Sequence, residues 1–426
     1  MVKMTNICYN IVVKILPLGG IYIWRNKTMR SINIAIAGLG GRGYGLLKDV
    51  ILTFDEVNVL GVCDLYEDRA QRGFDAVKEK KGNEPLKTLN YKDLLEIPNL
   101  DALVVTTSWE THIPIAIDAM NAGIRPGVEV GAAYSIDQLW QLVRTSEETG
   151  VPCMLMENCC YGREELMVMN MVKQGLFGSI VHCQGGYRHD LREEIGNGRE
   201  NRHYRNANYL HRNCENYPTH ELGPIAQILG INHGNRMVKL TATASCARGM
   251  NEYLKREKGA DYDQAGAAWA QGDVVTTVIT CAHGETIVLT LDTTLPRYYS
   301  RGFHIQGTKG MYEEENQSIF IDEKDNHADF KWSEHWGNVK EYRDEYEHPI
   351  WKQFLNDGVR GGHGGMDYLV FRAFFESVAD GVNPPIDVYD MAAWMSIGVL
   401  TEESIAMGGA PVAIPDFTNG QWIEVR

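Results

Sequence analysis

Short apolar runs alternate with amphipathic stretches along the first third of the chain. Residues 57–63 and 101–107 are short and mostly apolar, which is typical of strands buried on both faces of a parallel sheet. Segments whose apolar residues recur at helical spacing follow at 113–122 and 135–150. Strands and helices that alternate through short connections predict an open, mostly parallel sheet with helices on its faces.

Beyond residue 156 strand patterns dominate, and His283-Gly284 marks a hairpin turn between two of the strands. Helical spacing returns in only a few places. The pattern therefore predicts a mixed sheet with a small number of helices packed on it. The expected strands are 180–187, 238–245, 273–281, 285–291, 301–306 and 318–321, and the expected helices are 163–174, one beginning near Pro218, 366–379 and 388–407.

The first predicted strand, residues 34–37, runs directly into a glycine-rich turn. There Gly38 would allow the tight turn, Gly40 would let the backbone approach a pyrophosphate, and Gly43 would let the next helix lie close on the strand. A helix-compatible segment and then an acidic residue, Asp64, follow at the spacing of dinucleotide-binding folds. This context favours a dinucleotide site over a glycine turn without a ligand. The turn residues expected to contact the cofactor are Gly38, Leu39, Gly40, Gly41, Arg42 and Gly43.

Asp64 also bears on which dinucleotide binds. A carboxylate at the end of the second strand hydrogen-bonds the ribose hydroxyls and would repel a 2′-phosphate, whereas an NADP site would usually place an Arg there. The residues that follow, Leu65-Tyr66-Glu67, carry no positive charge, so NAD is favoured. Asp64 could also be a helix N-cap, because Glu67 stands three residues on in a capping-box arrangement, and the two roles are compatible.

Charge and cysteine content exclude several classes of function. The chain has 426 residues, 44% of them hydrophobic, and a net charge of −15, which suits a large core and two domains. A sequence-independent nucleic-acid surface needs clustered Lys and Arg, and the one Arg-rich stretch, 199–212, is short and interleaved with Asn, His and Tyr. We therefore expect no nucleic-acid partner. Nine cysteines, an odd number, show neither a disulfide framework nor zinc spacing, so we expect reduced thiols, no metal and a cytoplasmic location.

The beginning of the chain needs a separate interpretation. Residues 7–24 are mostly apolar but are interrupted by Asn10, Lys14 and Pro17, so they resemble a poor signal sequence. Met29 stands just ahead of the first strand, and residues 1–29 are therefore interpreted as an upstream start or a leader peptide. No other run approaches the ~18 apolar residues of a membrane helix, so no membrane span is expected.

Several strings of residues resemble those of a known superfamily. They are Met156-Glu157-Asn158-Cys159-Cys160-Tyr161, Gly185-Gly186-Tyr187-Arg188-His189-Asp190-Leu191-Arg192, Tyr217-Pro218-Thr219-His220 with Leu222-Gly223-Pro224, and Gly362-His363-Gly364-Gly365-Met366-Asp367. With the order of elements, they resemble the Gfo/Idh/MocA superfamily of glucose-fructose oxidoreductase and inositol dehydrogenase over nearly all of residues 31–426. Within it they are most similar to glycoside hydrolase family 109, the NAD-dependent N-acetylgalactosaminidases.

The resemblance implies an α/β fold. An N-terminal Rossmann dinucleotide-binding domain, residues 30–155, would be followed by a C-terminal α+β domain, residues 156–426, whose open-faced mixed β-sheet covers the nicotinamide. It also implies a small carbohydrate substrate, an N-acetylgalactosaminide or a related glycoside, and a homo-oligomer.

The departures from the superfamily pattern narrow the function. Ordinary sugar dehydrogenases of this group carry Glu-Lys-Pro after the fourth strand and an Asp four residues before a catalytic His. Here Glu129 is followed by Val130 and Gly131, and Asn216 stands before His220. Both losses remove groups that help to take a proton from the sugar hydroxyl during oxidation. Net oxidation of a free sugar is therefore disfavoured.

The resemblance implies a hydrolysis in which NAD is regenerated. Transient oxidation of a bound sugar at C3 would acidify the C2 proton, a side-chain base would remove it, and the C1 substituent would leave before water adds and the ketone is reduced. Such a route uses Tyr and His rather than the paired carboxylates of conventional glycosidases. Tyr187 or Tyr217 is expected as the base at C2, with Tyr187 favoured by the resemblance. His220 would accept the proton of the C3 hydroxyl, and His189 would assist the leaving group or water.

Each of these residues also has a structural explanation. Tyr187 and His189 stand at alternate positions of a strand and could belong to an ordinary half-buried sheet face. Tyr217 to His220 could be no more than a helix start with Pro in its first turn. We expect the substrate to be bound by Tyr217 and His220 together with three arginines, Arg199, Arg202 and Arg205. The arginines lie in a polar stretch that is either simply solvated or a mobile cover that hydrogen-bonds the sugar hydroxyls.

The remaining candidates for cofactor contact lie near strand ends. Thr107 ends the strand at 101–107, whose carboxyl end should face the cofactor, and Trp109 and His112 follow it, although these two could merely pack and cap a helix. Glu129 and Asn158 complete the expected cofactor set. Three functions remain open: an NAD-dependent glycosidase, an NAD-dependent sugar or inositol dehydrogenase, and a cofactor-binding protein without catalysis.

Overall fold

Six parallel strands form the sheet of the N-terminal domain. The structure, a computed structural model, describes residues 29–325 and 331–424, so the expected leader in residues 1–28 lies outside it. In the strand order β3-β2-β1-β4-β5-β6, successive strands are added on one side of β1 and then on the other, so the topological switch point lies between β1 and β4. Open α/β sheets bind their ligands at such a point. The strands are β1 (Ile32–Ala37), β2 (Val57–Cys63), β3 (Leu86–Thr88), β4 (Ala102–Val105), β5 (Arg125–Val128) and β6 (Met154–Leu155).

Helices cover this sheet and connect its strands, as the alternating pattern predicted. Their boundaries follow local chemistry: the Ser135 hydroxyl accepts a hydrogen bond from the Asp137 amide at 3.1 Å to begin α5, and Gly150 ends the helix at φ 67°. The helix-compatible segment after the glycine-rich turn forms a helix that begins at Gly41 and gives way to a 3₁₀ turn after Asp49. The helices are α1 (Gly41–Asp49), α2 (Glu67–Lys81), α3 (Tyr91–Leu95), α4 (Trp109–Asn121) and α5 (Ile136–Thr149).

Eight strands form the sheet of the C-terminal domain, in the order β13-β12-β11-β7-β10-β9-β8-β14. Only β7 and β10 pair in parallel among them, so the sheet is mixed as expected, and the predicted hairpin at His283-Gly284 joins β9 to β10. The strands are β7 (Ile180–Arg188), β8 (Met237–Ala244), β9 (Val274–Cys281), β10 (Thr286–Asp292), β11 (His304–Gly307), β12 (Gly310–Glu313), β13 (Ser318–Ile321) and β14 (Val412–Ala413).

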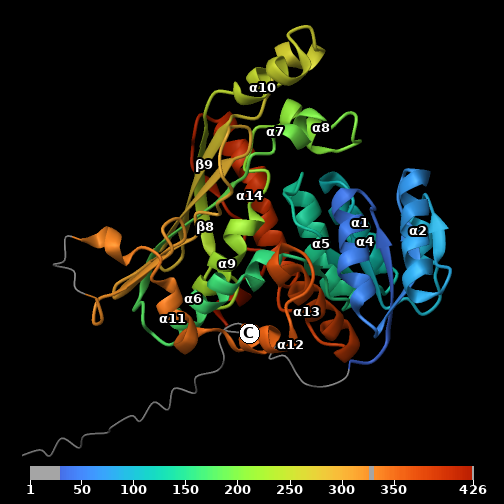
Figure 1. Ribbon diagram of the computed structural model, residues 1–426, viewed down its shortest axis with the longest axis horizontal. Helices are drawn as coiled ribbons and strands as arrows, with labels where there is room; N and C mark the ends of the chain where they lie inside the picture. The colour runs from blue at the N-terminus through green and yellow to red at the C-terminus, as the bar shows by residue number, and fades with distance from the viewer. Residues whose placement is uncertain (1–28, 326–330, 425–426) are drawn as a thin grey trace, which may run out of the picture.

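One face of this second sheet is packed and the other is open. Along β10 the side chains of Ile287, Leu289 and Leu291 are buried, whereas those between them are partly exposed. Helices α6 (Arg163–Lys173), α9 (Thr219–Leu229) and α14 (Val388–Ala406) lie between the packed face and the N-terminal domain (Figure 1). The tyrosine and histidine motifs at the end of β7 and the start of α9 therefore face the first domain.

Helix α13 (Met366–Asp380) comes late in the chain but packs against the first sheet. A Cβ on Gly127 of β5 would lie 2.8 Å from the Phe374 ring, so that strand and helix are in close contact. Arg125 adds a hydrogen bond to the Ser377 carbonyl at 3.0 Å. This packing brings the motif at 362–367 next to the glycine-rich turn, although more than 300 residues separate them in the sequence.

The polar stretch 199–212, expected as a loop, contains a helix. Its polar side chains are satisfied by tertiary contacts: the Asn206 amide, for example, donates to the Ile195 carbonyl at 2.9 Å and to Gln264 at 3.0 Å. Sequence periodicity does not reveal such contacts. No helix in the described part of the chain is both long enough and apolar enough to span a bilayer. The remaining helices are α7 (Arg192–Gly196), α8 (Arg205–His211), α10 (Gly249–Lys258), α11 (Val339–Tyr346) and α12 (Pro349–Asp357).

Candidate active site

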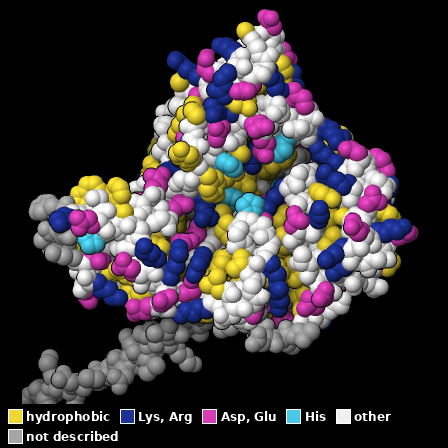
Figure 2. All heavy atoms as spheres, in the orientation of Figure 1, with side chains coloured by type: hydrophobic (Ala, Val, Ile, Leu, Met, Phe, Trp, Pro, Cys, Tyr) yellow, Lys and Arg dark blue, Asp and Glu magenta, His cyan; other side chains and the backbone are white. Residues whose placement is uncertain are grey.

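A cavity of about 980 Å³ lies between the two domains. Figure 2 shows histidine and hydrophobic side chains gathered where this face of the molecule is hollowed. The N-terminal domain contributes the glycine-rich turn and the carboxyl ends of β2 and β4. The C-terminal domain contributes the end of β7, the start of α9 and the segment between α7 and α8. The switch point of the first sheet therefore opens into a site that both domains complete.

The glycine-rich turn leaves room for a ligand at Gly40 and Gly41, but not at Gly38 or Gly43. Gly38 has φ +97°, and a Cβ there would lie 2.5 Å from the Thr106 carbonyl carbon; a Cβ on Gly43 would lie 2.1 Å from the Gly38 oxygen. Both glycines are required by contacts within the protein. A Cβ on Gly40 would meet nothing closer than Arg69 Nη1 at 3.7 Å. Gly40, Gly41 and the N-terminus of α1 line the cavity, which is the arrangement that receives a pyrophosphate.

Asp64 organises the neighbouring end of the cavity. Its Oδ2 accepts a hydrogen bond from the Leu39 amide at 2.7 Å, and its Oδ1 accepts one from the Tyr66 amide at 3.0 Å. The N-cap of α2 is Tyr66, so the capping-box interpretation of Asp64 and Glu67 is wrong. The carboxylate instead ties the glycine-rich turn to the start of α2. A ribose there would face a carboxylate that is already held in place.

The other expected cofactor residues fall into two groups. Thr107, His112 and Glu129 line the cavity, whereas Leu39, Trp109 and Asn158 lie behind its wall. His112 Nε2 is 3.0 Å from the Thr107 carbonyl, which can only accept, so Nε2 carries a proton. Burial lowers the pKa of His112 to about 4, and the ring is neutral at physiological pH.

Arg42 links the glycine-rich turn to the C-terminal domain. Its Nη1 and Nη2 donate to Asp367 at 2.8 and 2.9 Å, and Nη2 also donates to Glu129 at 3.0 Å. Asn158 and His363 contact the same Asp367 carboxylate, each at 2.8 Å. Burial alone would raise the pKa of Asp367, but the hydrogen bonds from His363 and Arg42 outweigh it and hold the pKa below its usual range. The network fixes α13 against the turn and the floor of the cavity.

The four expected catalytic side chains meet on the C-terminal side of the cavity. Ring centroids are 4.3 Å apart for Tyr187 and Tyr217, 4.8 Å for Tyr217 and His220, and 5.5 Å for Tyr187 and His220. The Tyr187 hydroxyl lies 3.1 Å from Nδ1 of His189. Burial, with the charge of Arg205, lowers the pKa of His189, so that its ring is neutral and can accept the phenolic proton. The Tyr187 phenol can therefore transfer its proton to the His189 imidazole.

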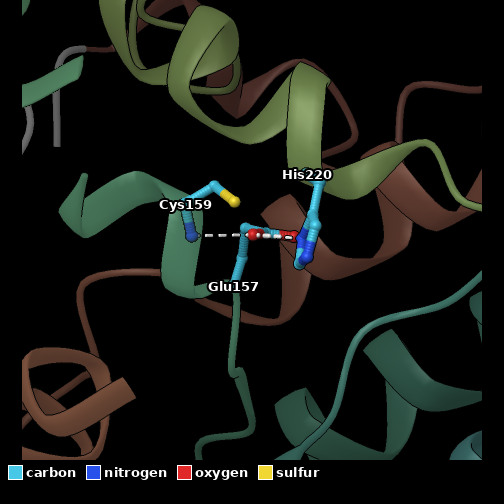
Figure 3. A group of neighbouring side chains, drawn as sticks. All are labelled: Glu157, Cys159 and His220. Carbon is cyan, nitrogen blue, oxygen red and sulfur yellow. Dashed lines mark hydrogen bonds and ion pairs between the residues drawn. The ribbon is translucent and has the colours of Figure 1, made fainter. Parts of the chain in front are cut away.

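Glu157 orients His220. Its Oε1 is 2.8 Å from His220 Nδ1 and also accepts the Cys159 amide at 2.9 Å (Figure 3). Burial alone would raise the pKa of Glu157, but the charge and hydrogen bond of His220 outweigh it, and the pKa lies below its usual range. An ionised Glu157 can only accept, so Nδ1 of His220 carries a proton. The Nε2 of a neutral His220 is then free to accept one.

Within the part of the chain that the structure describes, Glu157, Cys159 and His220 form a group that could hold a metal ion, because their ligand atoms lie within 4.8 Å of one another. Burial raises the pKa of the Cys159 thiol well above its usual range. A cysteine must be a thiolate to bind a metal ion, and burial opposes the thiolate at Cys159. The other two groups, Glu157 and His220, are already hydrogen-bonded to each other. The arrangement as it stands is one for proton transfer.

The three expected substrate arginines lie in different surroundings, although all line the cavity. The Arg205 guanidinium is buried, 4.9 Å from the ring centroid of Tyr217 and 5.9 Å from that of Tyr187. Arg199 pairs with Asp263 of its own domain at 2.6 Å. Arg202 pairs with Asp68 of the N-terminal domain at 2.7 Å. Of these three arginines, only Arg205 therefore lies among the expected catalytic side chains.

Comparison with known proteins places the chain. A family model described as "Oxidoreductase family, NAD-binding Rossmann fold" matches residues 32–157, and one described as "Glycosyl hydrolase 109, C-terminal domain" matches residues 161–424. The chain belongs to glycosyl hydrolase family 109. A family 109 protein of Stenotrophomonas maltophilia is 40% identical over 418 residues, covering 92% of this chain and 90% of its own. A protein of Tannerella forsythia named alpha-N-acetylgalactosaminidase is 35% identical over 420 residues, covering 93% and 88%.

Solved structures share the fold of this family 109 enzyme at low identity. The scyllo-inositol dehydrogenase of Lactobacillus casei has a TM-score of 0.64 at 14% identity and covers 91% of this chain and 99% of its own. The WlbA dehydrogenase of Bordetella pertussis, in complex with NADH and UDP-GlcNAcA, has a TM-score of 0.62 at 16% identity and covers 91% and 99%. The expected Rossmann domain and mixed-sheet domain are thus confirmed, and the cofactor class is a nicotinamide dinucleotide.

The departures from the dehydrogenase pattern have structural counterparts in this family 109 chain. Val130 lines the cavity where the Lys would stand. Gly131, with φ +154°, leaves space for Trp109, since a Cβ there would lie 2.4 Å from its ring. Asn216 is buried outside the cavity lining, where it donates to Gln271 at 3.1 Å and accepts from the Tyr209 hydroxyl at 3.3 Å.

Most of the residues that sequence analysis missed contact partners that are distant in the sequence. Glu157, His363 and Asp367 were part of the family strings, but no spacing rule assigns Glu157 to His220 or Asp367 to Arg42. Glu194, whose Oε1 is 3.2 Å from Arg205 Nε, gave no signal. A buried acid beside a strand end is the clue that could have singled out Glu157.

Proposed function

We propose that the chain hydrolyses α-N-acetylgalactosaminides and related glycosides by transient oxidation at C3, with NAD regenerated in each cycle. The observation that carries this proposal is the combination of two proton-transfer pairs, Tyr187 with His189 and Glu157 with His220, at one dinucleotide cavity. The names of the family 109 relatives support the sugar. Residues 30–155 would hold the dinucleotide and residues 156–426 the sugar.

The residues divide the proton transfers between them. A bound nicotinamide dinucleotide supplies the oxidation of C3 and its later reversal. His220 takes the proton of the C3 hydroxyl at Nε2, because Glu157 holds its Nδ1 proton in place. Tyr187 removes the C2 proton and can pass its own phenolic proton to His189 Nδ1, 3.1 Å away. His189 can then return a proton to the departing C1 oxygen.

The surroundings favour Tyr187 over Tyr217 as the base. Burial raises the pKa of Tyr217 well above its usual range, which opposes formation of a phenolate there. The Tyr187 hydroxyl has a neutral imidazole as an acceptor at 3.1 Å. The Arg205 guanidinium, 5.9 Å from the Tyr187 ring centroid and 4.9 Å from that of Tyr217, would stabilise phenolate charge on either ring and does not distinguish the two.

NAD is proposed over NADP because of Asp64. Replacing Asp64 with alanine should weaken NAD binding by about 1–3 kcal/mol, since ribose hydroxyls and the amides of Leu39 and Tyr66 lose their acceptor. Calorimetric titration of the protein stripped of nucleotide measures this loss. Glu84→Gln, an exposed carboxylate of the same domain, is the matched control. Equal affinity in the alanine variant, or tighter binding of NADP than of NAD to the wild type, would contradict the assignment.

The reaction itself is tested with a nitrophenyl α-N-acetylgalactosaminide in heavy water. Deuterium should appear at C2 of the released sugar, because the C2 proton is removed during turnover, and reduced dinucleotide should not accumulate in solution. Protein stripped of nucleotide should be inactive and should recover when NAD is added. Deuterium-free product would overturn the elimination route.

The second candidate is an NAD-dependent sugar or inositol dehydrogenase, favoured by the fold of the solved relatives. The same assay with free sugars separates the two, because a dehydrogenase would form reduced dinucleotide steadily. The apolar Val130 in place of a lysine argues against it. A homo-oligomer and a cytoplasmic location stay predictions.

A further inference from the structure

The segment between α7 and α8, residues 197–204 and here called the strap, crosses from the C-terminal domain to the N-terminal domain. Gly198, Asn201 and Arg202 of the strap line the same cavity as Asp64, Tyr66 and Arg69 of the N-terminal domain. Asp64 marks the end of a dinucleotide site at which the adenosine ribose binds. The strap therefore closes the adenosine end of the cavity, away from the catalytic tyrosines and histidines.

Three kinds of contact fasten the strap to helix α2 and its N-cap residue, Tyr66. Arg202 Nη1 and Nη2 donate to the two carboxylate oxygens of Asp68 at 2.9 and 2.7 Å. Arg69 Nη2 donates to the Asn201 carbonyl at 2.7 Å. The guanidinium groups of Arg202 and Arg69 lie 4.3 and 4.9 Å from the centroid of the Tyr66 ring. Charge, backbone and ring contacts thus join the strap to the start of α2.

The other end of the strap is fixed within its own domain. Arg199 pairs with Asp263 at 2.6 Å, and Lys258 contacts Glu200 at 2.6 Å and the Gly196 carbonyl at 3.0 Å. Opening of the strap would therefore break its contacts with α2, together with the ring contact of Tyr204 with Trp109 of α4 at 4.8 Å. An exposed ion pair alone is weak, but the Arg202 to Asp68 pair is bidentate and acts together with the neighbouring contacts. Arg202 also lowers the pKa of Asp68 to about 2, so the pair is ionised at ordinary pH.

We propose that the strap and α2 form a latch that retains the dinucleotide between catalytic cycles, with Arg202 and Asp68 as its closing pair. The inference rests on the proposed function, in which the cofactor ends each cycle as it began and gains nothing by leaving. It replaces the expectation that Arg202 binds the sugar. Product would leave from the other end of the cavity while the latch stays closed.

The test follows the loss of NAD from the holoenzyme. Purified protein loaded with NAD is desalted, and NAD in successive filtrates is quantified over time. Arg202→Gln and Asp68→Asn should each release NAD roughly 5- to 30-fold faster than the wild type. The double variant should release it no faster than either single variant, because each substitution removes the same Arg202 to Asp68 pair. The reversed pair, Asp68→Arg with Arg202→Asp, should recover retention. High salt should accelerate release from the wild type but not from the variants.

Lys78→Gln is the matched control, because Lys78 lies on the same helix and pairs with Glu84 of its own domain at 2.6 Å. Its release rate should equal that of the wild type. Rates within twofold of the wild type in both latch variants would overturn the latch. A wild-type protein that holds no dinucleotide, or that hydrolyses glycosides without one, would instead overturn the proposed function.

Discussion

Replacing Tyr187 with phenylalanine should lower kcat by roughly 10²–10⁴-fold, the usual cost of losing a general base. The ring and its packing against Tyr217 at 4.3 Å are kept, whereas the hydroxyl that contacts His189 at 3.1 Å is removed. Oxidation at C3 does not need this hydroxyl. The variant should therefore still form reduced dinucleotide once per active site, which a single-turnover absorbance measurement detects, while release of nitrophenol and exchange at C2 are slowed.

Two further variants make the Tyr187 result specific. Tyr217→Phe should lose less activity, because burial opposes ionisation of Tyr217. Tyr253→Phe, on α10 and away from the residues that line the cavity, should behave as the wild type. A Tyr187 variant with normal C2 exchange would assign the base to another residue, and a larger loss in Tyr217→Phe would identify which one.

The dinucleotide half of the site was predictable because its determinants are local. Gly38, Gly40 and Gly43 stand at fixed spacing after one strand, and the φ of +97° at Gly38 and the Gly38 oxygen beside Gly43 are local requirements, although Thr106 also excludes a side chain at Gly38. Tyr187 and His189 were likewise paired by strand periodicity. The order of strands and helices, and with it the fold, was predictable for the same reason, because alternation and apolar runs are properties of short segments.

The parts that could not be predicted depend on pairings between distant segments. Arg42 was expected to contact the cofactor, and it does line the cavity, but its pairing with Asp367, 325 residues away in the sequence, could not be predicted. Arg202 was grouped with Arg205 because the two are close in the chain. In the folded protein Arg205 lies beside the Tyr217 ring, whereas Arg202 pairs with Asp68 of the N-terminal domain. Sequence spacing shows the type of a side chain but not the partner that tertiary packing gives it.

Replacing Glu157 with glutamine should lower kcat by roughly 10²–10⁴-fold, although Glu157 touches His220 and not the sugar. An amide can donate to Nδ1 as well as accept from it, so the proton of a neutral His220 can move to Nε2, where it blocks acceptance of the C3 hydroxyl proton. The defect should therefore fall on oxidation. Single-turnover measurements should show slow formation of reduced dinucleotide, in contrast to Tyr187→Phe, and substrate deuterated at C3 should give a larger isotope effect than in the wild type.

A double-mutant cycle separates this positioning role from a purely structural one. If Glu157 acts through His220, then His220→Ala should abolish the effect of Glu157→Gln, and the double variant should be no slower than His220→Ala alone. NAD retention in the filtration assay should be unchanged in all three, because none of these side chains contacts the latch. Losses that multiply in the double variant, or an unaltered isotope effect in Glu157→Gln, would show that Glu157 supports the fold rather than the tautomer of His220.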